Sequence, residues 1–168
     1  MNNPGLPFHS IPDAPAAVSA GAVLGRLVDG IGFRFRWATE GLADGSLAFK
    51  PAPDCMSLGE LLDHVMELLA WVAAGVGVQA PAEGAGPVCE RVLVLAAALG
   101  ARFKAMTDDE VARCTIRSSR GDTRPVWNMV NGPLSDSLTH VGQILSWRRI
   151  SGAPAVPADV FRGLPPKA

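Results

Sequence analysis

The sequence is poor in the residues that nucleic-acid-binding proteins use most. It has no tyrosine, aromatic residues make up 6% of the chain, and 15 Lys and Arg residues are balanced by 16 Asp and Glu residues. A surface that stacks on bases and contacts phosphates is therefore not expected. The basic pair Arg148 and Arg149 is too small to change this conclusion. We expect no nucleic-acid partner.

Cysteine and long apolar runs are scarce as well. The cysteines, Cys55, Cys89 and Cys114, lie far apart without a CxxC or CxxCH spacing, so neither a zinc ribbon nor a c-type haem is expected. No uninterrupted apolar run reaches the ~20 residues that a membrane-spanning helix needs. The first residues also lack the basic start and apolar run of a signal peptide. We expect a cytoplasmic protein with reduced thiols and no membrane partner.

What the chain does have is a series of segments with helical periodicity. Its 168 residues suit a single domain, residues 1–168, that buries its own core. Apolar residues recur every three to four positions in segments that we expect to be helices, at about 16–40, 57–76, 87–106 and 125–150. Strand signals are weak. The predicted fold class is therefore all-α, a four-helix bundle.

Three segments outside these helices have weaker patterns. A Pro-rich irregular arm is expected at residues 1–15, and a polar stretch at 108–123 predicts a short helix or a loop. An extended tail is expected at 153–168, where Val160 and Phe161 are predicted to lie across the bundle. These segments connect or cover the helices and carry no motif of their own.

Several residues mark the helix ends. Ser57 and Glu60 form an S-x-x-E capping box, which predicts the start of the second helix. The Gly132-Pro133 pair lies inside the last segment, so that helix must start late or kink there, because proline removes a backbone donor. Gly152 predicts its end.

One stripe of the last predicted helix is polar. At about 100° per residue, it contains Asp136, His140, Gln143 and Trp147. The opposite side, predicted to face the core, contains Leu134, Leu138, Val141 and Leu145. The stripe has two interpretations, a solvated face or a functional site. Small flanking residues and a tryptophan, which is seldom left fully in water, favour a partly enclosed helix.

A histidine on the second predicted helix adds to this pattern. His64 lies at the edge of the apolar face, so it can approach Asp136 and His140 from a facing helix. Two imidazoles and one carboxylate leave an open position, which is typical of catalytic zinc sites and also fits non-haem Fe(II). Glu67 or Gln143 could orient these ligands, or position or deprotonate a bound water. His9, in the arm, is interpreted as a surface residue.

The segments that carry these residues, SLGELLDHVMELLAW and HVGQILSWRRISG, resemble the DinB-like (YfiT-like) metalloenzyme superfamily. The resemblance covers most of the chain after residue 20. It implies an up-down-down-up four-helix bundle, frequently a homodimer. It also implies a divalent metal on one histidine from the second helix and an H-x-x-x-H from the last.

His64 and His140 match the first and last ligands of that pattern, whereas Asp136 stands where the family has another histidine. Aspartate can still bind zinc, nickel or iron, although the change can also weaken the site. The surrounding stretch WNMVNGPLSDSLTHVGQI looks like a branch of the superfamily in which aspartate is the usual residue.

The resemblance also implies an activity. Family members include hydrolases and thiol-dependent transferases, such as mycothiol-dependent maleylpyruvate isomerase and bacillithiol S-transferase. By resemblance, the chain is a metal-dependent hydrolase or thiol S-transferase that acts on a small molecule. Nickel or zinc is the expected metal, with iron or manganese as alternatives, and a low-molecular-weight thiol is the co-substrate in the transferase case. The competing hypothesis is a non-enzymatic bundle that binds a small ligand or a partner and has a weakened or lost metal site.

Overall fold

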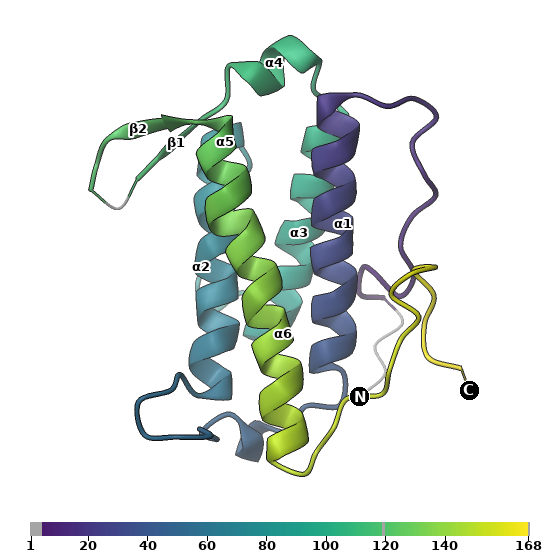
Figure 1. Ribbon diagram of the computed structural model, residues 1–168, viewed down its shortest axis with the longest axis vertical. Helices are drawn as coiled ribbons and strands as arrows, with labels where there is room; N and C mark the ends of the chain where they lie inside the picture. The colour runs from purple at the N-terminus through teal and green to yellow at the C-terminus, as the bar shows by residue number, and fades with distance from the viewer. Residues whose placement is uncertain (1–4, 119, 168) are drawn as a thin grey trace.

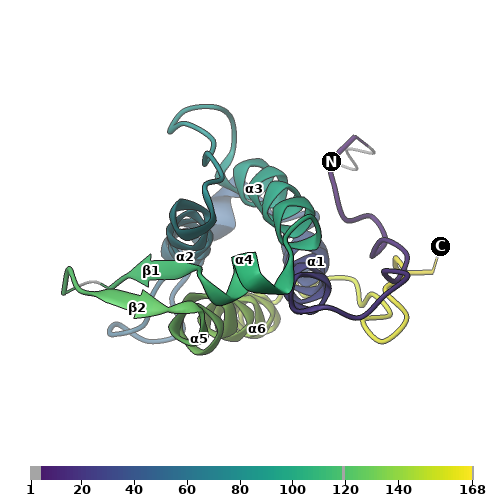
Figure 2. The same ribbon diagram turned by 90° about the horizontal axis from the view of Figure 1, so that it is seen from above.

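The computed structural model describes residues 5–118 and 120–167, and the chain is mostly helical there (Figure 1). Its long helices are α1 (Ala20–Thr39), α2 (Leu58–Val76), α3 (Val88–Lys104) and α6 (Ser135–Ile150). Short helical pieces are η1 (Asp44–Ser46), α4 (Asp108–Ala112), α5 (Val126–Met129) and the π-helical η2 (Val130–Leu134). Seen from above, the long helices surround a common apolar core (Figure 2).

Hydrogen bonds between helix ends give the relative helix directions. Arg102 of α3 donates from Nε to the Val76 carbonyl, which brings the ends of α2 and α3 together. Trp147, near the end of α6, donates to the Met56 carbonyl just before α2, so α2 and α6 are antiparallel. Arg148 donates to the Ala38 carbonyl, so α1 and α6 end on the same side. Helices α1 and α6 therefore run in one direction, and α2 and α3 run in the other (Figure 1).

Helix α2 begins at the predicted capping box. The Ser57 hydroxyl accepts from the Glu60 amide at 3.1 Å, and the Glu60 carboxylate accepts from the Ser57 amide at 2.6 Å. The Ser57 amide, with help from Lys50, lowers the pKa of Glu60 to about 2. The helix ends at Gly77, whose φ of 72° suits glycine.

Helices α1 and α3 approach closely because glycines line their contact. A Cβ atom on Gly21 would lie 2.3 Å from the Phe103 carbonyl oxygen, and one on Gly25 would lie 2.9 Å from the Gly100 oxygen. A buried Asp29 carboxylate accepts from Lys104 Nζ at 2.5 Å across the same contact. Backbone packing at this interface therefore leaves no room for larger side chains.

A β-hairpin lies where the sequence predicted only a short helix or a loop. Strands β1 (Thr115–Arg117) and β2 (Thr123–Pro125) pair antiparallel, beyond the short helix α4. Trp71 of α2 donates from its indole to the Arg117 carbonyl. The Thr115 carbonyl packs directly against α2 at Gly75, where a Cβ atom would lie only 2.7 Å from its oxygen. Strands of three residues are too short for a period of two to be recognised, and contact with α2 stabilises them.

The last helical segment kinks at the predicted position. Gly132 has φ −93° and ψ −111°, which is not helical, and the π-helical turn η2 joins α5 to α6 there. The buried face of α6 differs from the expectation, however. Leu138 and Leu145 are only half-buried. The residues that α6 buries are Ser137, Val141, Ile144 and Arg148.

Arg148 explains part of that difference. Its guanidinium is buried and donates to the carbonyls of Ala38 and Glu40 at the end of α1, at 2.9 and 2.8 Å. Its Nε also donates to the Ala153 carbonyl at 2.9 Å. A charged residue thus occupies a core position, which the apolar periodicity could not reveal.

The arm and the tail lie together beside α1 (Figures 1 and 2). The Ile11 amide donates to the Gly163 carbonyl at 2.9 Å, and the Phe8 ring packs against Gly32 of α1. Phe161 is 97% exposed, so the prediction that it packs across the helices is wrong. The arm's residues 1–4 and the tail's residue 168 lie outside the described part of the chain.

Candidate metal centre

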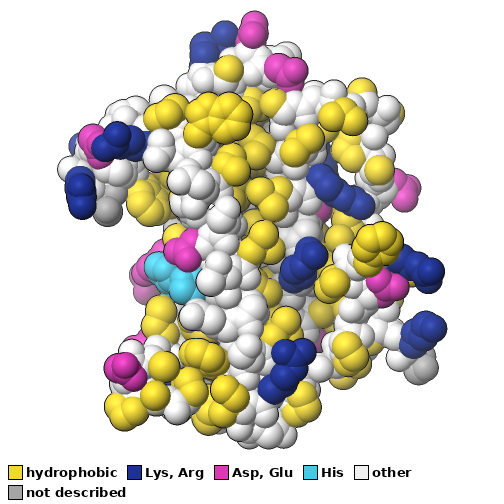
Figure 3. All heavy atoms as spheres, viewed as in Figure 1, with side chains coloured by type: hydrophobic (Ala, Val, Ile, Leu, Met, Phe, Trp, Pro, Cys, Tyr) yellow, Lys and Arg dark blue, Asp and Glu magenta, His cyan; other side chains and the backbone are white. Residues whose placement is uncertain are grey.

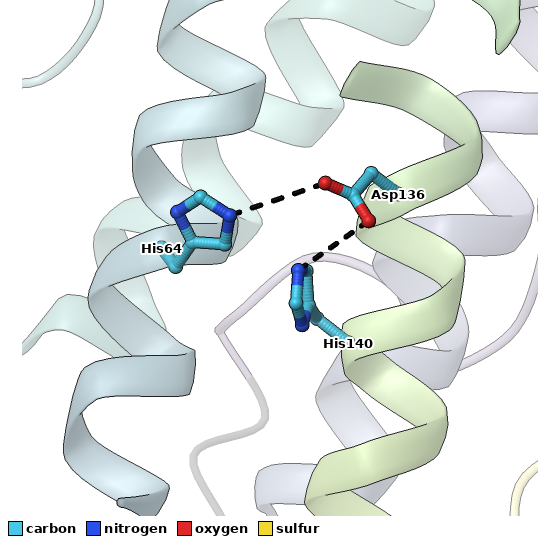
Figure 4. Close-up of side chains that lie close together, drawn as sticks. All are labelled: His64, Asp136 and His140. Atoms are coloured by element: carbon cyan, nitrogen blue, oxygen red, sulfur yellow. Dashed lines mark ion pairs between the residues drawn. The ribbon is translucent and has the colours of Figure 1, made fainter. Parts of the chain in front are cut away.

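The three predicted ligands lie close together between α2 and α6 (Figure 4). His140 Nε2 is 3.4 Å from one carboxylate oxygen of Asp136, and His64 Nε2 is 4.0 Å from the other. One ligand atom from each residue can be chosen so that all lie within 4.8 Å of one another. In a tetrahedral zinc site with bonds of about 2.0–2.2 Å, ligand atoms are about 3.3–3.6 Å apart. The separations are close to those of a metal site.

The local structure explains why these side chains converge. Asp136 and His140 are four residues apart, so they project from one side of α6. The antiparallel packing of α2 places His64 opposite them, with its ring centroid 4.7 Å from that of His140 and the planes at 79°. The kink at Gly132 ends just before this turn of α6. Two facing helices therefore build the cluster.

Each histidine has a second partner on its outer side. His64 Nδ1 lies 3.2 Å from a Glu67 carboxylate oxygen, and His140 Nδ1 lies 2.6 Å from the Gln143 side-chain oxygen. These oxygens accept hydrogen bonds, so each neutral ring carries its proton on Nδ1. Each Nε2 lone pair is then left facing Asp136.

The inner face of the cluster consequently consists of acceptors alone. With both rings neutral, two imidazole lone pairs and a carboxylate repel one another unless a positive charge, from a bound cation or a proton on one ring, lies between them. A divalent cation satisfies all three groups, and outer acceptors on Nδ1 are the usual partners of metal-binding histidines. The donor set, one carboxylate and two nitrogens, suits zinc, nickel or iron and does not discriminate among them.

The cluster is open on one side. The exposed fractions of the side chains are 13% for His140, 32% for His64 and 48% for Asp136. Asp136 also lines a cavity of about 510 Å³, together with Leu68 and Trp71 of α2. An ion bound here would be reached by water and by small molecules.

The structure separates the roles that the sequence left open for Glu67 and Gln143. Both contact the outer ring nitrogens rather than the inner face. They are therefore placed to orient the imidazoles and to fix their tautomers, whereas contact with a bound water would require the opposite side. This geometry favours the orienting role.

The remaining candidate residues lie elsewhere. His9 packs edge-on against Trp37, with ring centroids 5.6 Å apart, and is not part of the cluster. Burial raises the pKa of the Cys89 thiol to about 11 and also raises that of Cys114, so neither is a thiolate near neutral pH. Sequence reasoning missed the hairpin residues Ser118 and Arg124, which line the cavity beside Asp136.

Comparisons with known proteins leave the chain without an assigned family. No family model, curated protein or solved structure matches it. None of the helices in residues 5–118 and 120–167 is long and apolar enough to cross a membrane. The DinB-like resemblance thus rests on the two helical motifs quoted above, and it enters the proposal below on that basis.

Proposed function

We propose that the protein is a divalent-metal-dependent enzyme, a hydrolase or thiol S-transferase, whose metal ligands are His64, Asp136 and His140. One observation carries the proposal. Both imidazoles turn Nε2 toward the same carboxylate, 3.4 and 4.0 Å away, while their outer nitrogens contact Glu67 and Gln143. With neutral rings and no cation, this arrangement opposes three electron-rich groups.

Different residues of the chain would have different roles at such a site. His64, Asp136 and His140 would hold the ion and leave a position for an exchangeable ligand. Glu67 and Gln143 would keep both rings in the Nδ1–H tautomer. A bound zinc or nickel ion would lower the pKa of a coordinated water or thiol, which supplies a nucleophile near neutral pH.

The proposal includes a DinB-like, up-down-down-up four-helix bundle. Its support is the direction of the long helices, α1 and α6 against α2 and α3, together with the placement of the ligands on the second and the last long helices. The homodimer implied by the resemblance belongs to the same proposal. Sedimentation that shows a concentration-independent monomer would count against it.

Elemental analysis of purified protein tests the metal site. The chain is stripped with chelator, reloaded separately with zinc, nickel, manganese or ferrous iron, and desalted. We expect one ion per chain for zinc or nickel in the wild type and at most a small fraction in His64→Ala, Asp136→Ala and His140→Ala. Asp63→Ala, which removes an exposed carboxylate next to His64, is the matched control and should load fully.

Two further results make the outcome decisive. Loading with zinc should raise the Tm of the wild type and of Asp63→Ala but not that of the ligand variants, since an ion bound only to the folded state stabilises it. One ion per chain that persists in both Asp136→Ala and His140→Ala would show that the ligands are wrong. A wild type that stays metal-free under every loading condition would favour the non-enzymatic, ligand-binding bundle.

A further inference from the structure

The face that carries the candidate metal centre is hollowed beside it. Figure 3 shows a recess between the projecting hairpin, which bears charged side chains, and the cyan histidine below. The recess corresponds to a cavity of about 510 Å³, within the ~300–1,000 Å³ range of small-molecule sites. Since Asp136 lines this cavity, it opens directly onto the cluster.

The walls of the cavity are mostly apolar. Its apolar lining residues are Leu68, Trp71, Ile116 and Pro133. The Trp71 ring is fixed there because its indole nitrogen donates to the Arg117 carbonyl of the hairpin. These walls fit the apolar body of a small molecule and contribute little to its orientation.

The polar groups lie toward the hairpin end. Ser118, Arg124 and Asn128 line the cavity there, and Arg124 is its one cationic residue among the residues that the structure describes. Asn128 lies on α5 and Asp136 on α6, on opposite sides of the kink at Gly132, and both line the cavity. A ligand that spans the cavity thus meets a cation at one end and the metal cluster at the other.

Arg124 is positioned by a neighbour and keeps donors to spare. Its guanidinium pairs with the Asp122 carboxylate, which the Ser118 hydroxyl contacts in turn. That contact with Ser118 and the charge of Arg124 lower the pKa of Asp122, so the pair is ionised at neutral pH. A guanidinium has five N–H donors, and Arg124 is 52% exposed, so it can also bind a second carboxylate with paired hydrogen bonds.

We propose that this cavity binds a small carboxylic acid with an apolar body, whose carboxylate pairs with Arg124 and whose opposite end reaches the cluster of His64, Asp136 and His140. The inference rests on the proposed function for what happens at the cluster. Binding at the Arg124 end depends only on the cavity and its charge.

Calorimetric titration with 4-phenylbutyrate tests the proposal, with the neutral 4-phenylbutyramide as the matched ligand. Both are titrated into metal-stripped and zinc-loaded full-length protein. We expect the acid to bind both forms of the wild type, and the amide to bind at least about tenfold more weakly, because a charge-assisted pair is lost. Arg124→Gln should lower the affinity for the acid by a similar factor, and Arg124→Lys should retain part of that affinity.

Arg120→Gln, an exposed arginine of the same hairpin that does not line the cavity, is the matched control and should bind like the wild type. Circular dichroism confirms that each variant is folded. The inference is overturned if the wild type does not bind the acid at millimolar concentration, if acid and amide bind equally, or if Arg124→Gln is unaffected. The acid is a simple metal ligand if its binding requires zinc, is lost in His140→Ala and is unchanged in Arg124→Gln. That outcome also overturns the inference.

The same titrations separate this inference from the proposed function. Arg124-dependent binding in a chain that holds none of the four metals would support the carboxylate site and reject the metal-dependent function. Full zinc loading without acid binding would support the metal site and reject the carboxylate site.

Discussion

Two helix contacts of the molecule differ in the residues that form them. One joins α1 to α3, and the other joins α2 to α6. Glycines bring α1 and α3 so close that their backbones nearly touch, and they share the most extensive contact of any two helices in the described residues. Across α2 and α6, polar side chains face one another around a gap that opens to solvent. The first contact contains a charged pair, Asp29 and Lys104, at 2.5 Å, whereas the second places two imidazoles against one carboxylate.

The difference indicates that the two contacts have different roles. The α1–α3 contact satisfies its own polar groups and fixes the bundle, so changes there should alter the stability of the fold. The α2–α6 contact leaves acceptors that an ion would satisfy, so changes there should alter ligand binding with less effect on stability. Substitutions in the α1–α3 contact are therefore expected to lower stability more than ligand binding. Substitutions in the α2–α6 contact are expected to lower ligand binding more than stability.

Gly21→Ala tests the close contact and should give the largest effect. The new methyl group would collide with the backbone oxygens of Phe103 and Met106, at 2.3 and 2.7 Å, and backbone atoms cannot move aside cheaply. We expect a loss of about 3 kcal/mol in the free energy of unfolding, measured with urea. Zinc stoichiometry should stay unchanged in the folded protein.

Gly142→Ala is the matched control for that substitution. A Cβ atom on this exposed position of α6 meets nothing within 4 Å. Alanine should therefore stabilise the protein by about 0.5–1 kcal/mol through its helix propensity. Equal losses from both substitutions would contradict the comparison drawn between the two contacts.

Gln143→Ala and Glu67→Ala test the open contact and should have intermediate effects. Removal of an outer partner of a metal-binding histidine weakens metal affinity by about 10–100-fold. We expect the larger loss for Gln143→Ala, because its contact is shorter than that of Glu67, 2.6 against 3.2 Å, and because His140 is less exposed than His64. Zinc affinity is measured by chelator competition.

The same variants distinguish orientation from catalysis. If Glu67 or Gln143 handled a proton of a bound water, its removal would lower kcat and leave zinc affinity unchanged. An unchanged zinc affinity in both variants would therefore reject the orienting role.

The start of α2 gives the smallest effect, and it depends on pH. The pKa of Glu60 is about 2 in the folded chain, below its ordinary value of 4.5, so its cap stabilises the fold above about pH 4.5. That contribution declines as the pH falls from about 4.5 toward about 2. We expect Glu60→Gln to be less stable than the wild type at pH 7, and we expect the difference to be much smaller at pH 2.5, in urea titrations.

Much of this arrangement could be predicted from the sequence, and the gaps have physical causes. The capping box at Ser57, the kink at Gly132 and the pairing of Asp136 with His140 were predicted because each depends on local spacing. The approach of His64 was predicted from its place at the edge of the apolar face of a facing helix. The buried face of the last helical segment was predicted only in part. Leu134 and Val141 are buried as expected, but Ser137 and Arg148 also occupy core positions and make α6 nearly uniform in polarity around its axis.

The hairpin and the carboxylate-binding end of the cavity were not predicted. The short strands are held by contacts with α2, through Trp71 and Gly75, that lie more than a dozen positions away in the sequence. Arg124 has no local motif, since its place in the wall of the cavity arises only when the hairpin folds against the helices. Long-range contacts of this kind leave no periodicity to recognise.

Arg148 has a consequence for how the chain folds. The carbonyls at the end of α1 accept their hydrogen bonds from a guanidinium more than a hundred residues later. The first helix is therefore completed only when the last one docks, which joins the beginning and the end of the chain in one cooperative event. A ribosome that has released only the first half of the chain holds a first helix in which the Ala38 and Glu40 carbonyls still lack this donor.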